Sequence, residues 1–171
     1  MALAELPLVA SVADRFQMTE VTTVLEEAAL DKLSLDMLGD VLTWSGRCGM
    51  QQLEADALAM ASKRFEEFAQ TTGFLRMGEE ALTTVLEQDC LAASNEKAVW
   101  EAVLVWMKAG AGETRGRGVV GRIRFPLMKE EYLRDRVAES VCQEHKEWIM
   151  GIVLEALRAK AALREGVVID S

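Results

Sequence analysis

The sequence predicts an all-α fold built from stacked antiparallel helical hairpins. Half of the 171 residues are hydrophobic, so one ordinary domain of this length buries a core without disulfides or metals. Only two prolines occur in the chain, and the stretches between turns are rich in Ala, Leu, Glu and Met, which are good helix formers. Apolar residues recur at helical spacing in short runs. No heptad repeat persists long enough for a coiled coil.

Three short helices are predicted before the first clear break in the pattern. The first helix carries an apolar stripe that starts at Leu8, and Pro7 lies in its first turn, where the missing N–H costs nothing. Thr19 and Ser34 are the predicted N-caps of the second and third helices. The segment SGRCG at 45–49 then interrupts the helical periodicity and predicts a turn.

Two longer helices are predicted in the middle of the chain. The first extends from Met50 to Ala69 with apolar residues at clean helical spacing. Ser94 is the predicted N-cap of the second, over 95–108, because an acidic residue follows in the first turn, where a negative charge favours the helix dipole. On this helix, Trp100 and Trp106 are expected to pack in the core and at its rim.

The last third of the sequence contains the only break in composition. Residues 109–121, AGAGETRGRGVVG, predict a flexible loop with a basic character. From Glu130 to Arg164 the apolar pattern stays helical, and it fits either one unbroken helix that starts at Arg136 or a helix bent near Gly151. The tail beyond Arg164 is expected to fray.

Charge and composition favour protein partners over nucleic acid and membranes. Acidic residues number 28 against 19 basic ones, a formal net charge of −9, and a surface of that sign repels phosphate backbones. No run of about 18 apolar residues is present for a membrane span, and the N-terminus lacks the basic region of a secretory signal. Three widely spaced cysteines fit reduced thiols. We therefore expect a cytoplasmic protein, with the nucleus as the alternative.

The residues that usually carry catalysis occur in patterns that favour structural roles. The GRGVVG string at 116–121 matches a dinucleotide-binding pattern, but a helix rather than a strand precedes it. His145 is the only histidine, so it cannot form a zinc-binding pair, and it is expected to be solvated or half-buried. Cys48 is the thiol expected to be exposed, with a pKa that Arg47 could lower; an ordinary loop cysteine is favoured over a redox sensor. No catalytic residue, cofactor or metal is predicted.

An ordered series of landmarks resembles the BACK domain of BTB–BACK–Kelch proteins. The landmarks are FEEF at 65–68, GFL at 73–75, LTTVL at 82–86, DCL at 89–91, SNE at 94–96, AVWEAV at 98–103, Trp106, RIRFPL at 122–127 and YL at 132–133. The resemblance divides the chain into three parts. Residues 1–42 are similar to the last helices of a BTB domain and the link that follows, 43–133 to the BACK domain, and 134–171 to closing helices and a tail.

This resemblance implies a scaffold with no catalytic activity. Members of the family are substrate adaptors of cullin-3 RING ubiquitin ligases, in which the BTB domain dimerises and grips the cullin, the BACK domain sets the spacing, and a propeller holds the substrate. Cullin-3 is thus the implied partner, and a transcriptional or cytoskeletal interaction module outside ubiquitin ligation is the alternative. The residues implied to contact the cullin lie on the matching helical pair: Leu35, Met37, Leu38, Val41, Leu42 and Leu53.

Departures from the family pattern leave two further points open. Most of a BTB domain and the whole propeller have no counterpart in this sequence, so the chain would be a fragment or a shortened relative, and its dimerisation stays undetermined. In addition, three glycines at 116, 118 and 121 stand where the family has a helix before its RFPLL segment. Each glycine weakens such a helix by about 1 kcal/mol relative to alanine.

Overall fold

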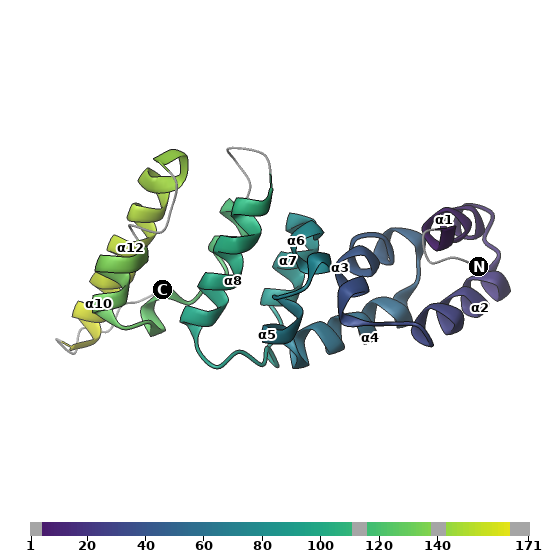
Figure 1. The fold of residues 1–171 in the computed structure, drawn as a ribbon, viewed down its shortest axis with the longest axis horizontal. Helices are drawn as coiled ribbons and strands as arrows, with labels where there is room; N and C mark the ends of the chain where they lie inside the picture. The colour runs from purple at the N-terminus through teal and green to yellow at the C-terminus, as the bar shows by residue number, and fades with distance from the viewer. Residues whose placement is uncertain (1–4, 111–115, 138–142, 165–171) are drawn as a thin grey trace. The chain divides into compact units, whose positions relative to one another are not determined.

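The structure is a computed structural model that describes residues 5–110, 116–137 and 143–164 (Figure 1). Every regular element within these ranges is helical, which confirms the predicted all-α class. The chain divides into two compact units, an N-terminal unit, Met1–Ala92, and a C-terminal unit, Ala93–Ser171.

The N-terminal unit is a series of short helices that pack on one another. Helix α1 packs against α2, and α3 packs against both α4 and α6. The elements are α1 (Leu6–Arg15), α2 (Thr19–Leu30), α3 (Leu35–Trp44), the 3-10 turn η2 (Gly46–Cys48), α4 (Gln51–Lys63), α5 (Phe65–Phe68), α6 (Thr72–Arg76) and α7 (Glu79–Leu86).

Three phenylalanines form the centre of the N-terminal core. The ring of Phe74 meets the rings of Phe65 and Phe68 edge-on, at centroid distances of 6.1 and 5.4 Å. All three side chains are fully buried. Edge-to-face pairs of this kind contribute about 0.5–1.5 kcal/mol each beyond the burial of their area. These ring contacts hold α5 and α6 against each other.

Two glycines allow α3 and α6 to approach unusually closely. A Cβ atom at Gly39 would collide with the backbone carbonyl oxygen of Gly73, and a Cβ atom at Gly73 would collide with the carbonyl oxygen of Asp36. Both glycines are buried in the contact between the two helices. Only residues without a side chain permit this separation of the backbones.

The C-terminal unit is built around the long helix α8. Its elements are α8 (Glu96–Ala109), α9 (Arg117–Val120), the 3-10 turn η3 (Phe125–Leu127), α10 (Glu130–Tyr132), the π-helical turn η4 (Leu133–Val137) and α12 (Gln143–Arg164). Trp100 and Trp106 are both fully buried, as predicted for the core. Trp100 meets Phe125 of η3 at a centroid distance of 5.4 Å, which holds the RFPL segment against α8.

Several predicted helix boundaries differ from the structure. The helix predicted from Met50 to Ala69 breaks at Arg64, close to where the carbonyl oxygen of Ser62 accepts a hydrogen bond from the distant backbone N–H of Ala92 at 2.8 Å. Asn95 rather than Ser94 caps α8, since its Oδ1 accepts from the Ala98 N–H at 3.0 Å. Met18 rather than Thr19 occupies the cap position of α2.

The segment predicted as a loop over 109–121 is partly helical. Helix α9 occupies Arg117–Val120 and buries Val119 and Val120. The burial of these two valines therefore outweighs the low helix propensity of the neighbouring glycines. Residues 111–115 lie outside the described residues. Helix α12 continues through Gly151, so the helix is not interrupted at that glycine. The tail expected to fray also lies outside the described residues.

Candidate functional site

The six predicted partner-contact residues lie on α3 and α4, and the structure buries four of them. Leu38, Val41, Leu42 and Leu53 are buried in the N-terminal core, whereas Leu35 and Met37 are half-buried. A buried side chain supports the shape of a surface but does not touch a partner directly. Of the six predicted residues, Leu35 and Met37, at the start of α3, therefore keep the most accessible surface for a contact.

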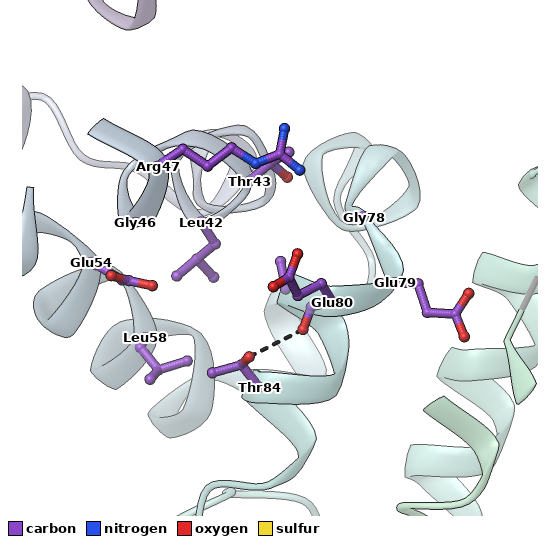
Figure 2. A pocket seen from close by; sticks show the side chains of 11 residues that line it. Leu42, Thr43, Gly46, Arg47, Glu54, Leu58, Gly78, Glu79, Glu80 and Thr84 are labelled. Atoms are coloured by element: carbon purple, nitrogen blue, oxygen red, sulfur yellow. Dashed lines mark hydrogen bonds between the residues drawn. The ribbon is translucent and has the colours of Figure 1, made fainter. Parts of the chain in front are cut away.

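A cavity of about 250 Å³ lies farther along α3, where its C-terminal end and η2 face α4 and the start of α7 (Figure 2). Leu42 and Leu58 give the cavity an aliphatic wall, and Arg47, Glu54 and Glu80 place charged groups around it. This volume is below the range of about 300–1,000 Å³ that is typical of small-molecule sites. The cavity therefore suits a side chain of a protein partner better than a whole small ligand.

Three of the four charged residues that line this cavity form no ion pair with any residue that the structure describes. In the part of the chain that the structure describes, Arg47, Glu54 and Glu80 form no ion pair. Their charges are therefore available to groups from outside. Because both signs are present, the cavity favours a polar side chain over a purely apolar one.

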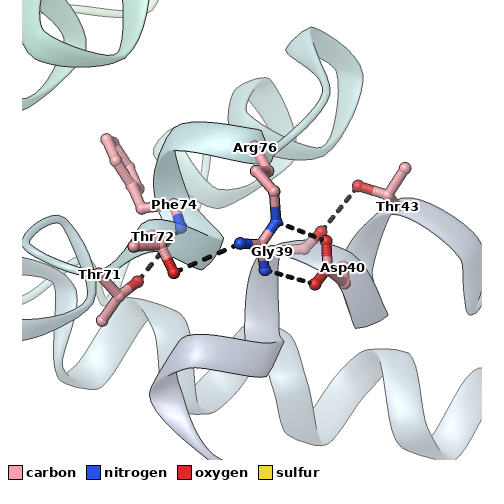
Figure 3. A network of polar contacts seen from close by, with 7 residues as sticks. All are labelled: Gly39, Asp40, Thr43, Thr71, Thr72, Phe74 and Arg76. Carbon is pink, nitrogen blue, oxygen red and sulfur yellow. Dashed lines mark hydrogen bonds and ion pairs between the residues drawn. The ribbon is translucent and has the colours of Figure 1, made fainter. Parts of the chain in front are cut away.

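A polar network fixes α6 to α3 beside the two close-packed glycines (Figure 3). The guanidinium of Arg76 donates to the carboxylate of Asp40 at 2.7 and 3.4 Å and to the Oγ1 of Thr72 at 3.3 Å. Its hydrogen bond to Asp40 raises the pKa of Arg76 above its ordinary value. At the start of α6, the Oγ1 of Thr71 caps the helix by accepting from the N–H of Phe74 at 3.2 Å. Of these bonds, the Arg76–Asp40 pair joins α6 to α3, and the others lie within α6 and its cap.

A glutamate on α2 accepts hydrogen bonds from backbone N–H groups in the first turn of α4. The Oε1 of Glu26 accepts from the backbone N–H groups of Gln52 and Leu53 at 3.1 and 3.3 Å. The residue at the cap position, Met50, offers no side-chain hydrogen bond, so Glu26 satisfies two donors that would otherwise need water. Sequence reasoning missed this role because Glu26 lies 26 residues away from Gln52, without a local signal.

Two predictions about reactive side chains are wrong. Cys48 is buried rather than exposed; its Sγ lies 3.9 Å from the carbonyl oxygen of Pro7. Burial and the negative charge of Asp14 raise the pKa of the Cys48 thiol, which is opposite to the lowering expected from Arg47. Of the two cysteines that the structure describes, Cys90 is the exposed one. His145, expected to be solvated or half-buried, is likewise buried, against Trp148 at a centroid distance of 5.9 Å.

Within the described ranges, no three His, Cys, Asp or Glu residues come close enough together to hold a metal ion. Among the same residues, no helix combines the length and apolar character needed to cross a membrane.

Comparison with known families identifies the class of protein that this architecture defines. Residues 40–138 match the family model described as "BACK: BTB And C-terminal Kelch". Because the match covers more than half of the 171 residues, the chain belongs to the BACK family. The resemblance that the ordered landmarks predicted is thus confirmed.

The relatives are Kelch-like proteins, which are much longer than this chain. Kelch-like protein 41 of Homo sapiens is 29% identical over 130 residues, which cover 74% of this chain and 21% of that protein. Kelch-like protein 2 of Rattus norvegicus is 29% identical over 101 residues (57% and 17%). Kelch-like protein 7 of Gallus gallus is 27% identical over 105 residues (60% and 18%). The chain therefore spans about a fifth of the length of the curated relatives it matches.

Proposed function

We propose that this chain is the helical spacer of a substrate adaptor for a cullin-3 RING ubiquitin ligase and that it acts by binding alone. The observation that carries the proposal is the match of residues 40–138 to the BACK family, together with the similarity to Kelch-like proteins. Cullin-3 adaptors of this type combine a BACK domain with a BTB domain and a propeller. The proposal places the scaffold in the cytoplasm, with the nucleus as the alternative.

The geometry of the N-terminal unit supports a rigid spacer that also offers a contact surface. Leu38 and Leu53 are fully buried in the core, and they would hold the α3–α4 pair in one shape without touching the cullin. Leu35 and Met37 keep part of their apolar surface accessible and would make the contact. The cavity beside Leu42, on the same helix, would accept a polar side chain of the partner.

Calorimetric titration of the chain with the N-terminal region of cullin-3 tests the proposal. The double variant Leu35→Asp/Met37→Asp should weaken binding by about tenfold or more, because it places two charges in an apolar contact. Val105→Asp is the matched control, since Val105 is an exposed apolar residue on α8 in the other compact unit. Unchanged melting temperatures would show that the double variant is folded.

If no binding is found, even with a complete BTB domain fused to the N-terminus of the chain, the cullin proposal is refuted. A transcriptional or cytoskeletal role would then be the better hypothesis. Identification of the proteins that co-purify with the native full-length gene product separates these alternatives.

A further inference from the structure

A second recess lies within the C-terminal unit, at the start of α8. It has a volume of about 440 Å³ and is bounded by the first turn of α8, the RFPL segment and the start of α10. This volume falls within the range of about 300–1,000 Å³ typical of binding pockets. The recess therefore has room for one or two side chains of a bound segment.

The apolar part of this recess is left open by the fold. Leu127 is 68% exposed, whereas its neighbours Phe125 and Met128 are almost completely buried. The backbone between them is restrained because Pro126 has a fixed φ angle. A single exposed leucine on a surface is ordinary. Here, however, Leu127 borders a recess whose walls also include Met128 and Tyr132, so a bound apolar side chain would be covered from several sides.

One negative charge at the recess is already neutralised within the chain. The Oε1 of Glu96 accepts from the Nε of Arg124 at 2.6 Å, and its Oε2 accepts from the backbone N–H of Arg124 at 3.2 Å. Only 10% of the Glu96 side chain is exposed. This carboxylate is therefore directed into the protein, and it opposes an incoming negative group only weakly.

The other two charged residues that line the recess are lysines, one of which, Lys97, is paired with Glu101. The Nζ of Lys97 lies 5.2 Å from the centre of the Tyr132 ring and 3.7 Å from the Oε1 of Glu101, which also accepts from the Tyr132 hydroxyl at 3.2 Å. Lys129, which also lines the recess, is exposed and forms no ion pair with any described residue. A chain with a net charge of −9 thus presents an unpaired ammonium beside an uncovered leucine.

We propose that this recess binds an acidic segment of another protein. An apolar side chain of the segment lies against Leu127 and Met128, and a neighbouring Asp or Glu carboxylate pairs with Lys129. A polyanion such as nucleic acid fits less well, because its phosphate backbone offers no apolar group to cover the exposed Leu127. This site is separate from the α3 surface proposed for the cullin.

A random peptide library displayed on phage and selected on the whole chain tests the chemistry without presupposing a partner. The enriched peptides should combine an acidic residue with an adjacent Leu, Ile, Met or Phe. Synthetic copies of these peptides, titrated by fluorescence anisotropy, should bind more weakly as salt rises from about 0.05 to 0.3 M, because the pairing is electrostatic and partly exposed. Enrichment of basic or uncharged peptides, or of none, overturns the proposal.

Variants of the chain locate the site of binding. Leu127→Asp and Lys129→Glu should each weaken binding by about tenfold, because each places a negative charge against the acidic segment. Lys129→Arg should retain most of the affinity. Val105→Asp, on the same helix but about 12 Å along its axis from Lys97 at 1.5 Å per residue, should leave the affinity unchanged. If Leu127→Asp and Lys129→Glu both bind like the unmodified chain, the recess is not the site.

The same variants separate this site from the proposed cullin function. Leu127→Asp should titrate with cullin-3 as the unmodified chain does, while the double variant at Leu35 and Met37 should still bind the selected peptides. Loss of peptide binding in that double variant would contradict the separate site. Melting curves of every variant identify any that do not fold, and Lys129→Glu, which changes an exposed side chain, keeps the test valid if Leu127→Asp is unstable.

Discussion

A Gly39→Ala substitution probes the close approach of α3 and α6 with the smallest possible side chain. Its Cβ would collide with the carbonyl oxygen of Gly73, and since that oxygen belongs to the backbone, relief requires one helix to move. Overpacking of this kind typically costs about 1–3 kcal/mol, and we expect the upper end because no flexible side chain can yield. Alanine regains about 1 kcal/mol of helix propensity. The net loss of unfolding free energy is therefore about 2 kcal/mol.

Scanning calorimetry with circular dichroism measures this effect. A loss of about 2 kcal/mol should lower the melting temperature by roughly 4–8 °C for a chain of this size. Gly151→Ala is the matched control, because a Cβ there meets nothing within 4 Å and the position is an exposed one inside α12. This control should gain up to about 1 kcal/mol. Gly39→Ala with an unchanged or raised melting temperature would refute the steric reasoning.

Three further predictions check other parts of the structure. Glu26→Ala should cost about 1 kcal/mol in urea denaturation, since it leaves two N–H groups at the start of α4 without their acceptor; full stability would contradict that cap. Thiol labelling at pH 8, resolved by peptide mass spectrometry, should modify Cys90 well before Cys48, whose thiol is buried and has a raised pKa; equal rates would show that the η2 turn is open. Leu38→Ala should cost about 2–5 kcal/mol, a loss typical of a buried leucine, whereas Leu35→Ala should change stability much less because its side chain is only half-buried.

The helical class could be predicted because apolar periodicity is a local property of the sequence. The exact helix ends could not, since they depend on competition between neighbours or on distant partners. Ser94 and Asn95 are both good capping residues, and local sequence does not decide which one occupies the cap position. The break at Arg64 coincides with a hydrogen bond from Ala92 to the carbonyl of Ser62, a contact that no local pattern announces.

The candidate sites were less accessible to sequence reasoning than the fold. Cys48 lies between glycines in a segment that looks like an exposed turn, but Pro7 of α1, 41 residues earlier, lies over its thiol. The recess at the start of α8 depends on the approach of Leu127 and Lys129 to a helix that begins about 30 positions before them. Landmark order predicted the BACK family. It carried no information about which apolar side chain of the RFPL segment stays uncovered.

The paired glycines of α3 and α6 also constrain how this sequence can change over evolutionary time. The space that a side chain at Gly39 would need is filled by the backbone of Gly73, and the space needed at Gly73 is filled by the carbonyl of Asp36. A larger residue cannot be introduced at either position while the other helix stays in place. A second substitution cannot compensate, because the colliding atoms belong to the backbone. Drift at this contact must therefore proceed through displacement of a helix, and the two positions should serve as a fixed reference when distant relatives are aligned.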